Sequence, residues 1–150
     1  MQREMTIRRA TYEETQSILN YHLVVLKEAT MGYVIPSREK AIEMMTPFLN
    51  GGGYYLVRVK NNVIQGWIGI GSIIDQNTDE HVGFINEMYV LPPYRKQGAA
   101  EKLCKAAFIQ LRAEGYKKVQ LNVYSGNHAK HLYEKLGFKD ISTLMSKSLE

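Results

Sequence analysis

The stretch FINEMYVLPPYRKQGAAEKL, residues 84–103, contains the change of pattern that decides the fold. Residues 84–90 are strand-forming, and the prolines at 92 and 93 end the strand because neither can donate a ladder hydrogen bond. A basic, glycine-containing turn follows, and apolar residues at helical spacing then predict a helix over 99–114 with Gly115 as its stop. The stretch therefore predicts a strand, a turn and a helix in direct succession.

The beginning of that helix is suited to an anion. The first N–H groups of a helix have no intrahelical acceptor, and together they carry about half a positive charge. Gly98 lets a ligand approach the backbone closely, and Ala99 and Ala100 keep side chains out of its way. Arg95 and Lys96 would add charge-assisted contacts to a diphosphate.

The rest of the chain predicts further strands and helices on both sides of this stretch. Thr11, with Glu14 three residues later, forms a capping box, and Asn61 with Asn62 forms a tight turn between two strands. Pro47 should fray the second helix. The predicted strands are 5–9, 54–59, 63–74, 81–90, 118–124 and 141–149, and the predicted helices are 11–28, 37–47, 99–114 and 128–136. The order is βααβββαβαβ, a mixed α/β sheet protein.

Length and composition limit the class of protein. A chain of 150 residues with 45% hydrophobic and 23% charged residues predicts one globular domain over 1–150 and excludes disorder. The net charge is +4, and the basic residues are scattered along the chain rather than clustered, which argues against nucleic acid as a partner. There is no apolar run for a membrane span, no signal-peptide core in MQREMTIRRA, and only one cysteine, so we expect a cytoplasmic protein.

The decisive stretch also carries a family resemblance. Residues 95–100 read Arg-x-x-Gly-x-Ala and resemble the pyrophosphate loop of the GNAT superfamily of N-acetyltransferases. Residues 90–94, Val-x-Pro-x-Tyr, and LYEKLGF at 132–138 resemble two further features of that family. A P-loop motif and a dinucleotide fingerprint are absent from the sequence, so nucleotide hydrolysis and hydride transfer are disfavoured. The resemblance implies an acetyl-CoA-dependent N-acetyltransferase that transfers acetyl directly to an amine in a ternary complex.

The resemblance also implies the residues that bind the cosubstrate. In the family, the strand before the loop splays from the next parallel strand, and the pantetheine arm bonds to the exposed backbone. Asn127 is placed six residues before Tyr133, whereas family members carry Asn seven before, where this chain has Gly126. Either the loop shifts or that contact is lost. The expected cosubstrate-binding residues are Met88, Tyr89, Val90, Arg95, Lys96, Gln97, Gly98, Ala99, Ala100 and Asn127.

Two catalytic residues follow from the resemblance. Tyr133 matches the tyrosine that protonates the leaving thiolate, and its alternative role is to pack its helix on the sheet. Glu87 matches an acidic residue that orders a water to deprotonate the amine, and its alternative role is a structural ion pair. Strand alternation puts Glu87 and Tyr89 on one face and Asn86 and Met88 on the other, without fixing which face meets the substrate.

Other reactive residues receive no catalytic role. Cys104 is expected to be inert core, and His128 with His131 has no third ligand, so we expect no metal. Tyr21, Tyr33 and Tyr54 are expected to border the amine pocket, and the amine itself stays open. The alternative function is a catalytically idle, CoA-binding regulatory module. A homodimer is compatible with the sequence, and a membrane partner is not expected.

Overall fold

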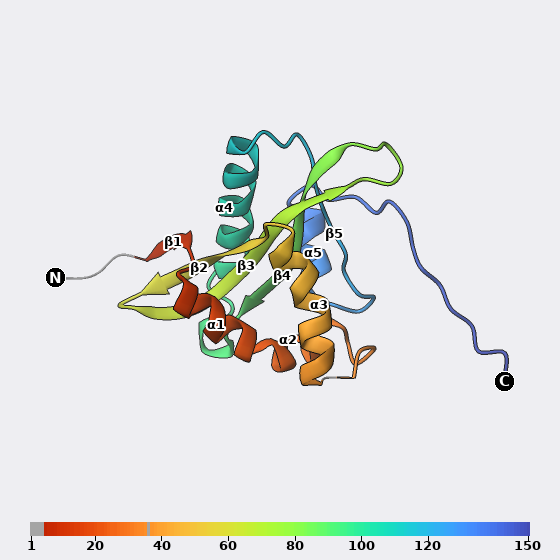
Figure 1. Cartoon of the computed structure of the whole chain (residues 1–150), viewed down its shortest axis with the longest axis horizontal. Coiled ribbons are helices and arrows are strands. Elements are labelled where there is room, and N and C mark those ends of the chain that lie inside the picture. The colour runs from red at the N-terminus through yellow and green to blue at the C-terminus, as the bar shows by residue number, and fades with distance from the viewer. Residues whose placement is uncertain (1–4, 36) are drawn as a thin grey trace.

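A computed structural model describes residues 5–35 and 37–150 of the chain (Figure 1). The strands are β1 (Thr6–Arg9), β2 (Tyr54–Lys60), β3 (Val63–Ile74), β4 (His81–Val90) and β5 (Val119–Leu121). The helices are α1 (Tyr12–Asn20), α2 (His22–Ala29), α3 (Arg38–Asn50), α4 (Ala99–Ala113) and α5 (Ala129–Lys135), with a 3₁₀ turn at Pro92–Tyr94. The predicted mixed α/β class is confirmed. What the sequence predicted for residues 1–4 and Pro36 lies outside the described residues.

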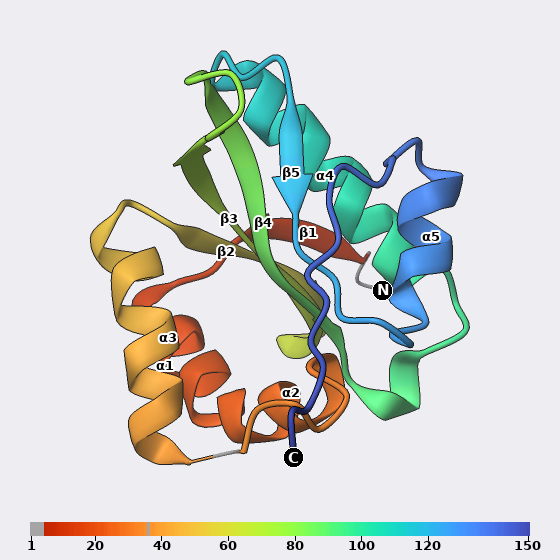
Figure 2. The same ribbon diagram turned by 90° about the vertical axis from the view of Figure 1, so that its right-hand side faces the viewer.

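The described strands form one sheet in the order β1-β2-β3-β4-β5. Neighbours are antiparallel except β4 and β5, which are parallel. Helices α1, α2 and α3 cover one face of the sheet, and α4 and α5 cover the other (Figure 2). Each face has its own core: Leu103, Cys104 and Ala107 of α4 are 0% exposed, and Ile18 and Val25 are buried under the opposite layer. Burial on both faces fixes the sheet between two helical layers.

The predicted helix over 11–28 is two helices. The capping box is present: Glu14 N–H donates to the Thr11 hydroxyl (3.2 Å), and the Glu14 carboxylate accepts from Thr11 N–H (2.9 Å). At Tyr21 the backbone N–H is shared between the carbonyls of Ser17 and Ile18, which tightens the last turn and ends α1. α2 then continues in a new direction along the sheet.

The second predicted helix does not end at Pro47. α3 continues to Asn50, and the Gly51 N–H donates to the Pro47 carbonyl at 3.0 Å. A proline inside a helix costs about 3 kcal/mol because it removes one hydrogen bond and its ring crowds the preceding turn. Phe48 and Leu49, directly after it, pack against the core on this face, so burial of the last turn outweighs that cost.

The sheet has a tight turn that the sequence predicted and, in β4, a bulge that matters for the site. The β2–β3 turn has Asn61 and Asn62 at φ 53° and 63°, as the tight-turn prediction requires. Between β3 and β4 the register shifts after Gly69, so that Asn86 is an extra residue in β4. A bulge of this kind twists the strand and changes which face the following side chains meet.

The C-terminal part departs from the prediction. The described β5 is only Val119–Leu121, shorter than the predicted 118–124, and the predicted strand over 141–149 is wrong. Residues 139–150 form no helix or strand and leave the body of the molecule as an extended segment, termed the C-terminal arm (Figure 1). The described order is therefore βαααβββαβα, which replaces βααβββαβαβ. Within residues 5–35 and 37–150, no helix is long and apolar enough to cross a membrane.

Candidate active site

The sheet opens between β4 and β5. The two strands pair only from Gly83–Val119 to Ile85–Leu121, whereas β4 continues to Val90 and keeps β3 on its other side. From Asn86 onward, one edge of β4 therefore has no strand partner in the described part of the chain. Free N–H and C=O groups on such an edge can bind an extended ligand that contains amides. An open edge at 88–90 is what the family resemblance implied.

The loop after β4 leads directly to the beginning of α4. Gly98 is the N-cap of α4 with φ 76°, and a side chain added there would meet nothing within 4 Å. Lys96 also has positive φ, at 63°, and Lys96 and Gln97 are exposed. The first N–H groups of α4 have no acceptor among the described residues. The predicted anion site is thus an open helix N-terminus with glycine at the closest approach.

Arg95 has a different environment from the predicted phosphate contact. Its Nε donates to the Val90 carbonyl (2.8 Å), and its Nη2 pairs with the Glu28 carboxylate (3.0 Å). The guanidinium also lies 5.2 Å from the centroid of the Tyr89 ring. Arg95 therefore ties the end of β4 to α2, and it fixes the position of the loop rather than standing free for a ligand.

On the face of β4 that meets α4 and α5, Tyr133 lies next to Cys104. The Cys104 thiol contacts the Met88 sulfur (Sγ–Sδ 3.5 Å), which brings the two residues to the open stretch of β4. Burial, followed by the neighbouring Cys104, raises the pKa of Tyr133 above its ordinary value of 10. Burial raises the pKa of Cys104 to about 12, so its thiol is neutral near pH 7, as expected of an inert core cysteine.

The opposite face of β4 carries a buried polar cluster. The Trp67 indole Nε1 donates to Glu87 Oε1 at 2.6 Å, and His22 Nδ1 lies 3.1 Å from Glu87 Oε2. The three residues are 3%, 9% and 5% exposed for Trp67, Glu87 and His22. The His22 contact is close but not aligned as a hydrogen bond, so Oε2 and both ring nitrogens have no hydrogen-bond partner within residues 5–35 and 37–150. Burial, with Glu87 nearby, raises the pKa of Tyr55 in the same layer.

The bulge in β4 corrects the predicted alternation. Glu87 and Tyr89 share the α1–α3 face and Met88 lies on the α4 face, as predicted. Asn86 does not join Met88: its amide nitrogen approaches the Met45 sulfur of α3 (3.9 Å), and it lines a hollow beside Phe48. The extra residue at the bulge puts Asn86 and Glu87 on the same side of the sheet.

The predicted aromatic border of the amine pocket is only partly assembled. Tyr21 packs on Trp67 and Tyr89 (ring centroids 5.9 Å apart in both pairs) beside the Glu87 cluster. Tyr33 stacks on Tyr124, which joins the segment after α2 to the loop after β5. Tyr54 is on the wrong face of the sheet for this role.

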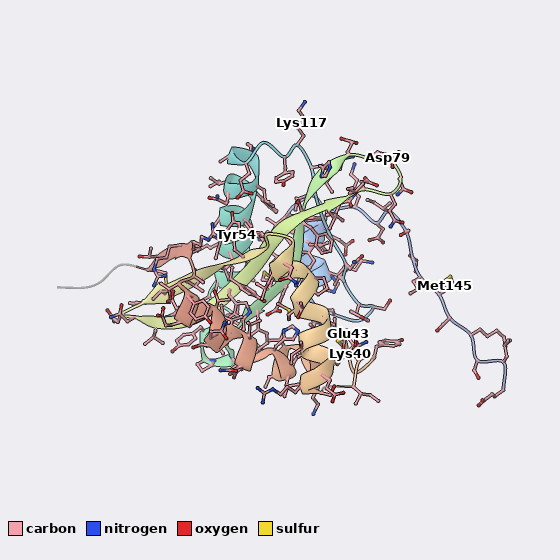
Figure 3. All side chains as sticks on the ribbon, viewed as in Figure 1. Lys40, Glu43, Tyr54, Asp79, Lys117 and Met145 are labelled. Atoms are coloured by element: carbon pink, nitrogen blue, oxygen red, sulfur yellow. The ribbon has the colours of Figure 1, made fainter. Side chains whose placement is uncertain are left out.

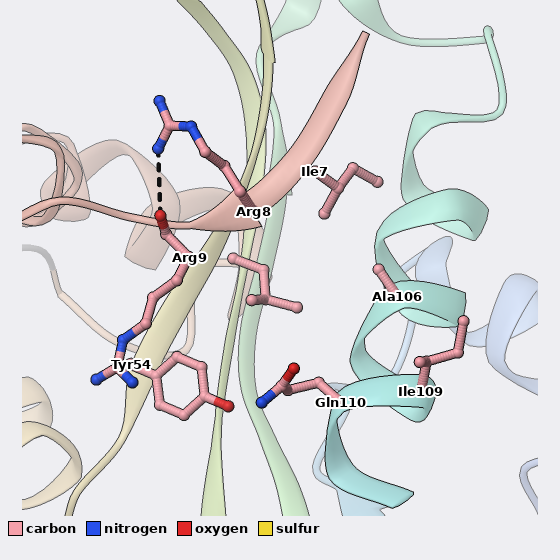
Figure 4. A pocket seen from close by; sticks show the side chains of 8 residues that line it. Ile7, Arg8, Arg9, Tyr54, Ala106, Ile109 and Gln110 are labelled. Atoms are coloured by element: carbon pink, nitrogen blue, oxygen red, sulfur yellow. Dashed lines mark hydrogen bonds between the residues drawn. The ribbon is translucent and has the colours of Figure 1, made fainter. Parts of the chain in front are cut away.

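Tyr54 instead borders a hollow of about 290 Å³ between β1, β2 and the C-terminal half of α4 (Figure 4). Its hydroxyl donates to Glu114, and the Arg9 guanidinium lies 4.1 Å from its ring centroid. Burial, followed by Glu114, raises the pKa of Tyr54 to about 12. Because the hollow is lined by Ala106 and Gln110 of α4 and not by its first turn, it is separate from the loop at Gly98.

Asn127 is held by protein contacts. Its side-chain Nδ2 donates to the Ala29 carbonyl (3.1 Å), and its Oδ1 accepts from the Ala129 N–H (2.9 Å). The residue thus joins the end of α2 to the beginning of α5, and both ends of its amide are engaged. The positive φ of Gly126 (86°) turns the chain just before it.

Sequence reasoning did not identify His22 and Trp67 as partners of Glu87. A signal for His22 was present, since it is a polar residue among Ile18 and Val25 on the apolar side of its predicted helix. Trp67 gave no such signal, because a tryptophan in a predicted strand is interpreted as a core residue. Within residues 5–35 and 37–150, no three His, Cys, Asp or Glu side chains gather in a group that could hold a metal ion.

Known proteins resemble this chain in sequence or in fold. The matched relatives include the uncharacterized N-acetyltransferase YycN of Bacillus subtilis, 31% identical over 62% of this chain and 59% of the relative. The chain thus matches less than two thirds of that relative's length. A predicted acetyltransferase of Clostridium acetobutylicum, solved with acetyl-CoA, has a TM-score of 0.75 at 18% identity, covering 97% of each chain.

A third protein is the aminoglycoside N-acetyltransferase AAC(6')-Iy in complex with a bisubstrate analogue, CoA-S-monomethyl-acetylneamine. Its TM-score is 0.69 at 17% identity, covering 98% of this chain and 99% of the other. These structural likenesses concern the fold. The sequence model of the acetyltransferase (GNAT) family matches residues 15–138, from α1 through the end of LYEKLGF. The chain, with its strand, glycine turn and helix at 84–103, therefore belongs to the acetyltransferase (GNAT) family.

Proposed function

We propose that the chain, acting as one domain over 1–150, is an N-acetyltransferase that moves the acetyl group of acetyl-CoA directly to a primary amine in a ternary complex. The observation that carries the proposal is the opening between β4 and β5 above the N-terminus of α4, with Glu87 on one face of β4 and Tyr133 on the other. The cytoplasm, where acetyl-CoA and a reduced Cys104 would coexist, is the proposed location.

The residues around the opening fit acetyl-CoA. Its diphosphate would meet the unpaired N–H groups at the beginning of α4, where Gly98 leaves space. Its amide-containing pantetheine arm would bond to the free edge of β4 at Met88–Val90. Lys96 and Gln97 would supply exposed polar contacts, and Ala99 and Ala100 would leave the helix start uncovered. Acetyl-CoA bound to the Clostridium acetobutylicum neighbour supports the same cosubstrate here.

Glu87 is the proposed base. An alkylammonium cannot attack a thioester because its nitrogen has no free electron pair, so a proton must leave first. Trp67 holds Oε1, whereas Oε2 has no hydrogen-bond partner within residues 5–35 and 37–150 and can accept that proton through a water. His22, at 3.1 Å, limits the positions that Oε2 can take, so we assign it a positioning role.

Tyr133 is the proposed acid. When the amine nitrogen attacks the thioester carbonyl, a C–N bond forms, the C–S bond breaks, and the sulfur leaves as a thiolate. The raised pKa of Tyr133 keeps its phenol protonated at neutral pH, so it can give that thiolate a proton. Tyr133 is 8% exposed and lies beside Cys104, whose thiol contacts Met88 of the open stretch of β4.

The identity of the acceptor amine is tested by a direct binding screen. A thermal-shift screen with acetyl-CoA present should find amines that raise the melting temperature, because a ligand of the native state stabilises it by mass action. Small amines, polyamines, aminoglycosides and peptides with free N-termini make up the set. Each hit is then assayed for thiol release and for a product heavier by one acetyl group, with CoA replacing acetyl-CoA as the control.

We expect at least one amine to be acetylated. If acetyl-CoA binds tightly but no amine in the set is acetylated, the alternative is favoured: a CoA-binding regulatory module without turnover. If acetyl-CoA does not bind at all, the proposed site at Gly98 is wrong, and so is the function.

A further inference from the structure

Arg58 of β2 is a buried cation. It is 4% exposed, and its Nε and Nη1 are buried without a hydrogen-bond partner within residues 5–35 and 37–150. A guanidinium stays protonated at physiological pH, so burial does not neutralise it. A buried charge is costly unless an opposite charge and hydrogen bonds replace the water that it has lost. An anion in contact with Arg58 would remove that cost.

The side chain of Arg58 lies on the face of β2 that α4 covers. Val57 and Val59, on either side of it, belong to the core under α1, α2 and α3. Strand alternation therefore turns Arg58 to the opposite face, together with Leu56. Arg58 also pairs across the strands with Ile7 of β1. Leu56 and Ile7 both line the hollow of about 290 Å³ between β1, β2 and α4, termed the α4 hollow (Figure 4).

The other end of the α4 hollow has balanced charges. Tyr54 projects there from the beginning of β2 toward α4 (Figure 3), and its hydroxyl donates to Glu114. The Arg9 guanidinium lies 4.1 Å from the centroid of the Tyr54 ring, so one cation and one carboxylate flank the same side chain. At the Arg58 end, the described residues supply no acceptor for the two buried nitrogens. An anion in the hollow is therefore favoured at the Arg58 end.

The wall between the two ends is apolar. It is formed by Ile7, Leu56, Ala106 and Ile109, and Ile109 is 65% exposed. The volume of 290 Å³ is about ten times the roughly 30 Å³ that one water molecule occupies in the liquid, so it fits a ligand of about ten non-hydrogen atoms. An alkyl chain in the hollow would cover Ile109 and the rest of this wall.

We propose that the α4 hollow binds an aliphatic carboxylate of about ten non-hydrogen atoms, with its carboxylate on Arg58 and its alkyl chain along the apolar wall toward Tyr54. A planar guanidinium matches a carboxylate through two parallel hydrogen bonds. The single charge of the carboxylate balances the single charge of Arg58. Because the hollow is lined by the C-terminal half of α4, the inference is independent of the proposed acetyl transfer at the Gly98 end.

Octanoate is the probe, since it has about ten non-hydrogen atoms. Its binding to the full chain is measured by calorimetric titration. Octan-1-ol has the same alkyl chain without the charge, and acetate has the charge without the chain. The wild type should bind octanoate at least about tenfold more tightly than either, because the ion pair and the buried chain both contribute.

Arg58→Met removes the charge and keeps a long side chain. It should bind octanoate about tenfold more weakly or worse. Its melting temperature without ligand should equal or exceed that of the wild type, because an unpaired buried charge has been removed. Lys105→Met is the matched control, since Lys105 is an exposed cation of α4 that pairs with Glu101, and it should leave octanoate binding unchanged.

A second pair of variants tests the place of the alkyl chain. Ala106→Phe fills the α4 hollow with a ring and should abolish octanoate binding. Ala113→Phe adds the same ring at an exposed position of α4 that does not line the hollow, and it should bind octanoate like the wild type.

Three results would overturn the proposal. Octanoate could bind no better than octan-1-ol or acetate. Arg58→Met could bind octanoate as well as the wild type, or melt at a lower temperature without ligand, which would mean that the chain itself supplies a partner for Arg58. Excess CoA could displace octanoate, which would place the carboxylate at the beginning of α4.

Discussion

The two faces of β4 bury different kinds of side chain. On the side of α4 and α5, Ile85, Met88 and Val90 pack with Leu103 and Cys104 into an apolar layer. On the side of α1, α2 and α3, the same strand presents Glu87 and Tyr89 to Trp67, His22 and Tyr55. One strand thus separates an apolar core from a core with a carboxylate and an imidazole inside it.

The difference has an energetic meaning. An apolar layer stabilises the fold by about 25 cal/mol for each Å² that it buries, and it needs no special partners. A buried carboxylate loses its water and is costly unless hydrogen bonds replace it. Glu87 has one such bond, from Trp67, and one oxygen without any within the described residues. An incompletely satisfied group of this kind is unfavourable for stability, which favours a chemical role for that face.

The largest expected effect is on acetyl-CoA binding at Gly98, the N-cap of α4. Gly98→Glu should weaken acetyl-CoA binding by on the order of 100-fold or more, because a carboxylate would lie where the diphosphate meets the first amides of α4. Gly115→Glu is the matched control, since Gly115 also has positive φ (98°) and open space around it but follows the other end of α4. Calorimetric titration with acetyl-CoA measures both variants.

Both glycine variants should lose stability to a similar degree, about 1 kcal/mol, because each puts a side chain on left-handed backbone. Only Gly98→Glu should lose affinity. An equal loss of affinity in the two would mean that strain, and not the anion site, is responsible.

Tyr133→Phe tests whether the α4 face of β4 takes part in catalysis. Removal of the phenol oxygen should lower kcat by on the order of 100-fold while acetyl-CoA affinity stays within about twofold. Because burial raises the pKa of Tyr133 above 10, the phenol is protonated throughout pH 6–10, and the loss should be the same across that range. Steady-state thiol release across these pH values is the measurement. Turnover equal to the wild type would leave Tyr133 as a packing residue.

A smaller effect on acetyl-CoA affinity is expected for Arg95 and Lys96, in the loop between β4 and α4. Arg95→Ala should weaken acetyl-CoA binding by roughly tenfold, because it frees the Val90 carbonyl and Glu28 and lets the loop move. Lys96→Ala removes an exposed point charge and should cost less, about threefold. Calorimetry at two salt concentrations separates them, since screening should diminish only the Lys96 effect. Equal losses that fade equally with salt would contradict the loop-fixing role of Arg95.

The smallest expected effect is on the free energy of unfolding. It concerns the ion pair between Arg8 of β1 and Glu14 of α1, on the Glu87 side of the sheet. Arg8 bonds to both carboxylate oxygens of Glu14 (2.7 and 3.0 Å), which lowers the pKa of Glu14 to about 2. This stabilisation is present above the unfolded pKa near 4.5 and is lost as pH falls toward 2. Because Arg8 is half exposed, Glu14→Gln should cost only about 0.5–1 kcal/mol in urea unfolding at pH 7 and less at pH 3. Glu13→Gln, also in the first turn of α1, is the matched control, because the ion pair of Arg8 is with Glu14.

The local parts of the fold could be predicted because their causes are local. The Asn61–Asn62 turn, the Thr11 capping box and the glycine turn at 98 depend on a few neighbouring residues, and each is present. The helix break at Tyr21 and the helix through Pro47 depend on packing against the sheet, which propensity does not contain. The absent strand at 141–149 has a strand pattern but no pairing partner within the described chain.

The site was predictable to the same extent. The loop and the Tyr133 helix follow from motifs, but the partners of their side chains come from distant segments. Arg95 meets Glu28, Asn127 meets Ala29, and Glu87 meets Trp67 and His22. Tyr54 points to the opposite face because strand alternation gives two choices and only the folded sheet decides between them.

If the Glu87 face supplies the base while the α4 face holds the cosubstrate, Glu87→Gln should affect turnover and leave cosubstrate binding intact. Glutamine keeps an oxygen for the Trp67 bond and removes the proton acceptor. Glu80→Gln is the control, since Glu80 is a half-exposed carboxylate that pairs with Lys118 just before β4, at the end of that strand away from the loop at Gly98. kcat is measured with an amine identified in the screen, and acetyl-CoA affinity is measured by calorimetry on the same samples.

We expect Glu87→Gln to lower kcat by on the order of 100-fold and to leave acetyl-CoA affinity within about twofold. Part of the rate should return as pH rises and more of the amine is already neutral. Glu80→Gln should keep kcat close to the wild type. A Glu87→Gln variant with wild-type kcat, or one that loses acetyl-CoA affinity as much as turnover, would contradict the division of work between the two faces of β4.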